Sequence, residues 1–179
     1  MACQTYNKSF LTACLNGDPG LARIYICDWA NILSTAFDTT GYVLSGMTCS
    51  GNTAQKAWYR VELLQDSSAS VDTPNVAVPS GVAISVPSVK FKLAHLDKDN
   101  IAAFDQLKHS KNVVIWERVD GTLFCTGLKR GLFFSAGTAG SDETTFEGIT
   151  VELKGKEPIG QYAIDTDLAN SFHSTFVVA

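Results

Sequence analysis

The sequence predicts a mainly β protein, an antiparallel β-sandwich or barrel with one packed α-helix, a long mid-chain loop or hairpin, and terminal arms. Three observations predict this class. Apolar and polar residues alternate over most of the chain, which is typical of strands with one solvated face. A single segment near the middle has helical spacing instead, and clusters of Gly, Pro, Asn and Asp separate the runs.

Size and composition indicate one folded domain. The chain has 179 residues, of which 45% are hydrophobic and 18% charged, which is enough to build a core without disulfides or metals. The turn cluster Asn16-Gly17-Asp18-Pro19-Gly20 closes the first segment. We therefore expect an N-terminal arm over 1–20, a single β-sandwich domain over 21–160, and a C-terminal tail over 161–179.

Five runs are expected to form strands, each with one wet face. In chain order they are ARIYICDW, AWYRVELL, SVKFKLAHL, NVVIWERV and TFEGITVELKG. In the third run Lys90 and Lys92 are expected to face solvent, and in the fifth Glu152 and Lys154 are expected to do so. The residues expected to face inward in these two runs are Val89, Phe91, Leu93, Ile149, Val151 and Leu153.

Two hairpins are expected in the second half. Asp120-Gly121 separates NVVIWERV from TLFCTGL, and this dipeptide favours a type I′ turn. The stretch TAGSDE separates GLFFSAG from TTFEGITVELKG, which predicts a second and looser hairpin.

The segment 97–110 is expected to be the one helix. Ile101, Phe104 and Leu107 recur every three residues and would face a sheet, while Lys108 and His109 suit the negative C-terminal end of the helix dipole.

The segment 66–88 is expected to form the long mid-chain loop. It holds three of the five prolines and no Lys or Arg. Connections of this length in a compact domain are usually functional. Exposed β-branched residues are best explained if another chain covers them. The expected subunit contacts here are Val76, Val78, Val82, Ile84 and Val86.

No catalytic, cofactor or metal site is expected. His95, His109 and His173 are far apart in the sequence, and no known nucleophile or phosphate-binding motif occurs. The five cysteines are odd in number and widely spaced, which favours reduced core thiols, although a Cys3–Cys14 bridge stays open. The three tryptophans are expected to pack in the core or at an interface.

Charge and hydropathy exclude several partner classes. The net charge is −4, so a general electrostatic attraction to nucleic acid or to an anionic membrane is not expected. No apolar run approaches the roughly 20 residues that a spanning helix needs. MACQTYNKSF lacks the apolar core of a signal peptide, so synthesis and folding in a cytoplasm are expected.

Three blocks of the sequence carry a resemblance to a known family. They are MAC with GLARIYICDWANI and AFDTTGYVLSG, then VKFKLAHLDKDNIAAFDQLKHSKNVVIWERVDGTLFCTGLKRGL, and finally FEGITVELKGKEP, which ends in Glu157-Pro158. Over about two thirds of the chain, their order resembles the tail-tube fold shared by phage tail tube proteins and the Hcp proteins of secretion systems. Within it the chain looks most like small virion proteins of crAss-like phages of Bacteroidetes. It departs from that group in 66–88 and after Pro158.

The resemblance implies a structural role in a virion. Family members form homo-oligomeric rings, so a hexamer or dodecamer is expected, in a phage tail or neck and next to other tail, neck or portal proteins. DNA would be only non-specific passing cargo, with no membrane and no small-molecule substrate. The C-terminal residues expected to dock onto a neighbouring subunit are Phe172, Phe176, Val177 and Val178, with packing onto their own domain as the alternative.

Two other functions fit the same pattern. The first is a non-catalytic β-sandwich binding module that recognises carbohydrate or protein. The second is an enzyme with a carboxylate pair hidden among the scattered Asp and Glu residues.

Overall fold

The computed structural model describes residues 21–50, 57–61, 70–77, 83–94, 98–142 and 146–178. The described chain is mainly β, as the sequence predicts. The strands are β1 (Leu21–Asp28), β2 (Ile32–Phe37), β3 (Val43–Cys49), β4 (Tyr59–Val61), β5 (Ser70–Asp72), β6 (Asn75–Ala77), β7 (Ala83–Ser85), β8 (Ser88–Ala94), β9 (Asn112–Arg118), β10 (Leu123–Thr126), β11 (Phe133–Asp142), β12 (Phe146–Lys154) and β13 (Tyr162–Ile164). The helices are α1 (Lys98–His109), α2 (Thr166–Phe176) and the 3-10 turn η1 (Trp29–Asn31).

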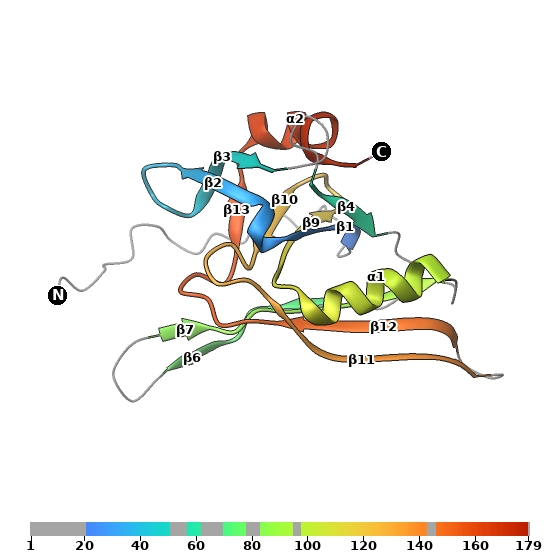
Figure 1. The fold of residues 1–179 in the computed structure, drawn as a ribbon. Coiled ribbons are helices and arrows are strands. Elements are labelled where there is room, and N and C mark those ends of the chain that lie inside the picture. Colours follow the sequence, from blue (N-terminus) through green and yellow to red (C-terminus); the bar gives the residue numbers. More distant parts are fainter. Residues whose placement is uncertain are drawn as a thin grey trace.

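The strands form two main sheets and a small hairpin. A seven-stranded sheet has the order β2-β3-β13-β10-β9-β1-β4, and a four-stranded sheet has the order β11-β12-β8-β5. Strands β6 and β7 pair only with each other among the described strands. Figure 1 shows α2 above the seven-stranded sheet, and α1 with the four-stranded sheet below it.

The seven-stranded sheet separates two hydrophobic cores. Tyr25 and Cys27 of β1 belong to the core shared with α2, whereas Ile24 and Ile26 belong to the core shared with α1 and the four-stranded sheet. All four side chains are buried. The expectation of one wet face is therefore wrong for β1, because a layer covers each side of the sheet.

The expected alternation is confirmed in the four-stranded sheet. Its inward side chains at Val89, Phe91, Ile149, Val151 and Leu153 are all buried. The side chain of Leu93 lies outside the described residues. On the opposite face, Glu152 forms ion pairs with Lys90 at 3.5 Å and with Lys154 at 2.8 Å.

Helix α1 forms where expected, but one of the three apolar residues expected to face a sheet is exposed instead. Phe104 is buried and meets Phe134 edge to face with 5.5 Å between ring centroids, and Leu107 packs partly against the same core. Ile101 is 47% exposed. A step of three residues falls about 60° short of a full turn, so Ile101 and Leu107 lie about 120° apart with Phe104 between them.

Both expected hairpins are present, with one correction. Gly121 N–H donates to the Arg118 carbonyl, and Arg118 N–H donates to the Thr122 carbonyl. The turn is therefore centred on Val119 and Asp120, followed by Gly121 at φ 83°, rather than being a type I′ turn centred on Asp120-Gly121. The second hairpin pairs β11 with β12 from Phe133↔Lys154 to Asp142↔Phe146.

The segment 161–178 is an integral part of the domain. Strand β13 lies between β3 and β10 in the seven-stranded sheet, and α2 covers that sheet. The expected C-terminal tail is therefore a strand and a second helix. Leu168, Phe172 and Phe176 recur every four residues, a helical signal that the sequence contains.

Candidate functional site

The expected contact segment 66–88 is described only in part. Val76 pairs with Ile84 in the β6–β7 hairpin, and Ile84 is partly exposed. Val78 and Val82 lie outside the described residues, as does the side chain of Val76. Val86 is partly buried and donates its N–H to the Pro74 carbonyl at 2.8 Å.

The base of this hairpin belongs to the domain. Ser85 is buried and exchanges two backbone hydrogen bonds with Glu157, each 2.9 Å long. Gln161 Nε2 donates to Thr73 Oγ1 at 2.7 Å. These contacts fasten both ends of the hairpin to the segment that links β12 to β13.

The C-terminal residues do not form the expected docking surface. Phe172 and Phe176 are buried in the chain's own core, where Phe172 meets the rings of Tyr25 and Trp58 edge to face. Val177 packs against the same core, and Val178 N–H donates to the Trp58 carbonyl at 2.9 Å. The alternative of packing onto the chain's own domain is therefore the correct one, and Val178, at 37% exposure, stays accessible.

The four-stranded sheet has a long strand at its edge. Among the described residues, no strand pairs with the outer side of β11. The strand has ten residues and neither Lys, Arg nor Pro, which are common protections of an edge; a register shift interrupts its ladder only between Phe134 and Ala136. Ala136 and Thr138 on it are exposed. This edge can accept a further strand through its backbone N–H and C=O groups.

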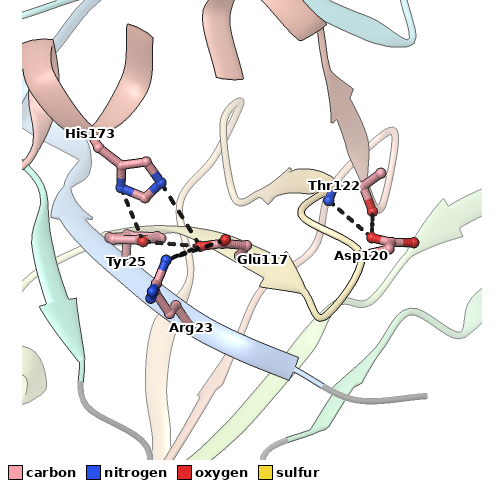
Figure 2. Close-up of polar contacts among 6 residues, drawn as sticks. All are labelled: Arg23, Tyr25, Glu117, Asp120, Thr122 and His173. Carbon is pink, nitrogen blue, oxygen red and sulfur yellow. Dashed lines mark hydrogen bonds and ion pairs between the residues drawn. The ribbon is translucent and has the colours of Figure 1, made fainter. Parts of the chain in front are cut away.

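A polar cluster joins α2 to two strands (Figure 2). The Tyr25 hydroxyl lies 3.1 Å from Glu117 Oε2 and 3.2 Å from His173 Nδ1. Because an ionised carboxylate only accepts, the hydroxyl donates to Glu117 and accepts from His173. Arg23 Nη1 lies 3.4 Å from both oxygens of Glu117.

Burial and the charge of Glu117 raise the pKa of Tyr25 to about 12. Its hydroxyl therefore keeps its proton at neutral pH and acts as a bridge between strand and helix. His173 Nε2 lies 3.9 Å from Glu117 Oε2, so a protonated His173 adds an ion pair to the same junction. The sequence alone does not indicate this cluster, because it joins positions as far as 148 residues apart.

A buried carboxylate lies in the link between β12 and β13. Glu157 is fully buried, and its carboxylate accepts backbone N–H bonds from Lys129 at 3.2 Å and Arg130 at 2.8 Å. Burial raises the pKa of Glu157 despite these bonds. The carboxylate thus fastens the β10–β11 loop to the link between the two sheets. No signal in the sequence predicts this role, since Glu157 stands in an ordinary polar stretch.

The described cysteines are core residues, as expected. Cys27, Cys49 and Cys125 are free and buried, and burial raises the pKa of each thiol. Cys3 and Cys14, between which the sequence leaves a disulfide possible, lie outside the described residues. Trp58 and Trp116 are buried, which agrees with the expectation that tryptophans pack in the core. Trp29 is 36% exposed.

The described ranges hold neither a metal cluster nor a membrane-spanning helix. Within them no group of three or more His, Cys, Asp and Glu residues is placed to hold a metal ion. In the same ranges no helix has the length and hydropathy needed to cross a membrane.

Comparisons with known proteins find no protein similar to this chain. No model of a known protein family matches the chain, and searches of curated proteins and of solved structures also find no match.

Proposed function

We propose that this protein is a virion structural protein, a ring-forming subunit of a phage tail or neck that helps to build a conduit for genome passage. The observation that carries the proposal is the outer edge of β11, with which no strand of the described residues pairs. A long edge strand without Lys, Arg or Pro presents backbone N–H and C=O groups with which a strand of another chain can pair. In a closed ring of subunits every such edge is paired, which removes the risk of uncontrolled aggregation.

The position of the edge suits a heterologous, head-to-tail contact. Strand β11 ends the four-stranded sheet on one side, and the short β5 ends it on the other. A neighbouring copy that pairs its β5 edge with β11 would keep its own β11 edge unpaired, and the next copy could then pair there. Such a contact forms a ring if the rotation closes.

The sequence resemblance supports the same role. The order of strands, helix and hairpin in the residues 89–132 resembles the centre of tail-tube subunits. The virion location and the neighbouring tail, neck or portal proteins are proposed on this resemblance.

Mass photometry and negative-stain microscopy of the purified protein test the proposal. We expect a discrete mass many times that of one chain and ring-shaped particles. The variant Ala136→Lys/Thr138→Lys places two charges on the exposed face of the edge strand and should remain a folded monomer. The control Ser171→Lys/Ser174→Lys adds the same charge to exposed positions of α2 and should still assemble.

Two outcomes would overturn the proposal. One is a wild-type protein that stays monomeric at every concentration and binds a glycan tightly, which would favour a binding module. The other is normal assembly of the edge variant, because ring closure would then not use β11.

A further inference from the structure

The edge strand β5 continues into the β6–β7 hairpin without a change of register. The β5–β8 ladder ends at the pair Asp72–Ser88, and the β6–β7 ladder begins three residues further on, at the pair Asn75–Ser85. A backbone hydrogen bond of 2.8 Å joins the two sides between these pairs. The strands therefore form one antiparallel ribbon whose outer edge runs over 70–77, and in Figure 1 its β6–β7 end projects beyond the rest of the four-stranded sheet.

Pro74 lies in this edge but does not interrupt it. Its carbonyl accepts the Val86 N–H, so the backbone of Pro74 faces the partner strand inside the ribbon. The backbone groups of successive residues in a strand point to opposite sides, so those of Asn75 point outward. The Ser85 backbone, opposite Asn75, bonds to Glu157 on the far side of the ribbon, which agrees with this phase. Among the described residues, no strand pairs with the outward groups of the edge.

The outer edge of β11 presents its backbone in a matching phase. Gly155 N–H donates to the Pro87 carbonyl at 3.1 Å, which continues the ladder between β12 and β8. Alternate residues of β12 counted back from Gly155 therefore face β8, and those between them face β11. Thr138, opposite Thr150, faces β12 in this phase, so the backbone groups of the neighbouring Gly137 point to the outer edge.

The strand directions suit an antiparallel contact between two copies. Strand β12 is antiparallel to β11, β8 is antiparallel to β12, and β5 is antiparallel to β8, so β5 runs opposite to β11. A rotation about a ring axis keeps the strand directions of every copy relative to that axis. The β5–β6 edge of one copy therefore meets β11 of the next copy in the antiparallel sense, which continues the pattern of the sheet.

We infer that the continuous edge 70–77 of one copy pairs with β11 of the next copy in the antiparallel sense, with Asp72 opposite Thr138. This alignment sets 70–77 against 133–140 and so uses most of β11. The inference rests on the proposed ring, and it names the two segments and the register that join the subunits.

Two geometric requirements favour this register. Asp72 and Thr138 are exposed on the same face of the sheet, because each pairs with a residue next to an inward-facing valine, Val89 or Val151. Within one copy Asp72 lies level with Phe133, so pairing with Thr138 displaces the next copy along the strands by about 15 Å. Four strands span about 19 Å, and the resulting tilt of about 38° falls within the roughly 35–45° of closed barrels.

Proline substitutions on the outer edge test the part that the ribbon takes in the contact. Asn75→Pro/Ala77→Pro removes two outward N–H donors and leaves the hydrogen bonds inside the ribbon in place. In sedimentation velocity we expect self-association about 30-fold weaker than that of the wild type, because two backbone hydrogen bonds are lost at every contact. The control Asn75→Ala keeps every N–H and should associate as the wild type does. Thermal melting shows whether the variants fold.

Cysteine cross-linking tests the register. Asp72→Cys and Thr138→Cys are placed in separate chains, and a short bis-maleimide should join these chains when they are co-expressed but should not join either chain to itself. The wild-type chain measures the background from the five native cysteines. A cross-link between two Thr138→Cys chains would show that β11 pairs with itself about a two-fold axis, which overturns the inference.

Two further results decide between this inference and the ring proposal. Normal association of the proline variant, or a co-expressed pair without the cross-link, overturns the inference. The ring proposal then stands if the edge variant Ala136→Lys/Thr138→Lys still fails to assemble. If the proline variant does not fold, the cross-link decides alone. A wild-type protein that never self-associates overturns both proposals.

Discussion

The backbone N–H of Arg130 donates a 2.8 Å hydrogen bond to the fully buried carboxylate of Glu157. The Glu157 carboxylate also accepts from the N–H of Lys129, and the Glu157 backbone exchanges hydrogen bonds with Ser85. One residue in the link between the two sheets thereby fixes a loop of one sheet and the base of the β6–β7 hairpin.

Replacing Glu157 should destabilise the protein. Glu157→Ala removes the acceptor of the Lys129 and Arg130 N–H groups and empties a buried site, and we expect a loss of about 2–5 kcal/mol in the free energy of unfolding. Glu157→Gln keeps one acceptor and should cost less. Urea denaturation measures both, and a near-wild-type alanine variant would mean that water replaces the carboxylate.

The raised pKa of Glu157 predicts a specific pH dependence. A carboxyl whose pKa is higher in the folded protein binds more protons there, so its contribution to stability falls as pH rises above the ordinary value of 4.5. Glu157→Gln has no such group. Wild-type stability relative to this variant should therefore decrease with rising pH from 4.5, and a parallel pair of stability-versus-pH curves from thermal melting would contradict the assignment.

Tyr25 and Tyr162 offer a matched test of hydroxyl function. Tyr25→Phe removes the bridge between Glu117 and His173 and should cost about 1–2 kcal/mol. The Tyr162 hydroxyl is buried with no hydrogen-bond partner among the described residues, so Tyr162→Phe should be neutral or stabilising. Equal losses in thermal denaturation would show that the bridge contributes nothing.

Two glycines with similar backbone angles should differ sharply in tolerance. Gly121 has φ 83°, and no atom lies within 4 Å of the position that a Cβ would take, so Gly121→Ala should cost about 1 kcal/mol. Gly127 has φ 85°, and a Cβ there would lie 2.9 Å from the Asn112 carbonyl oxygen. Gly127→Ala should cost about 3 kcal/mol or more, measured by chemical denaturation. Equal costs would mean that the β10–β11 loop shifts easily.

Two apolar residues of α1 should behave differently. Phe104→Ala empties a buried site between the helix and Phe134 and should cost about 3–5 kcal/mol. Ile101→Asp falls on an exposed position and should stay within about 0.5 kcal/mol of wild type. A severe loss for Ile101→Asp in chemical denaturation would mean that this position is covered.

Local sequence patterns predict the mainly β class, the two hairpins, helix α1 and the buried residues Val89, Phe91, Ile149, Val151 and Leu153 of the four-stranded sheet. Period-two alternation reports which face of a strand is apolar. It succeeds at Val89 and Ile149 because the described residues cover only one face of that sheet. The burial of both faces of β1 and the packing of Phe172 into the chain's own core depend on which elements cover each other in the folded chain. The tertiary structure also brought Tyr25 to His173 and the Glu157 carboxylate to the N–H of Arg130. These contacts join positions far apart in the chain, and local periodicity carries no information about which element covers a given face.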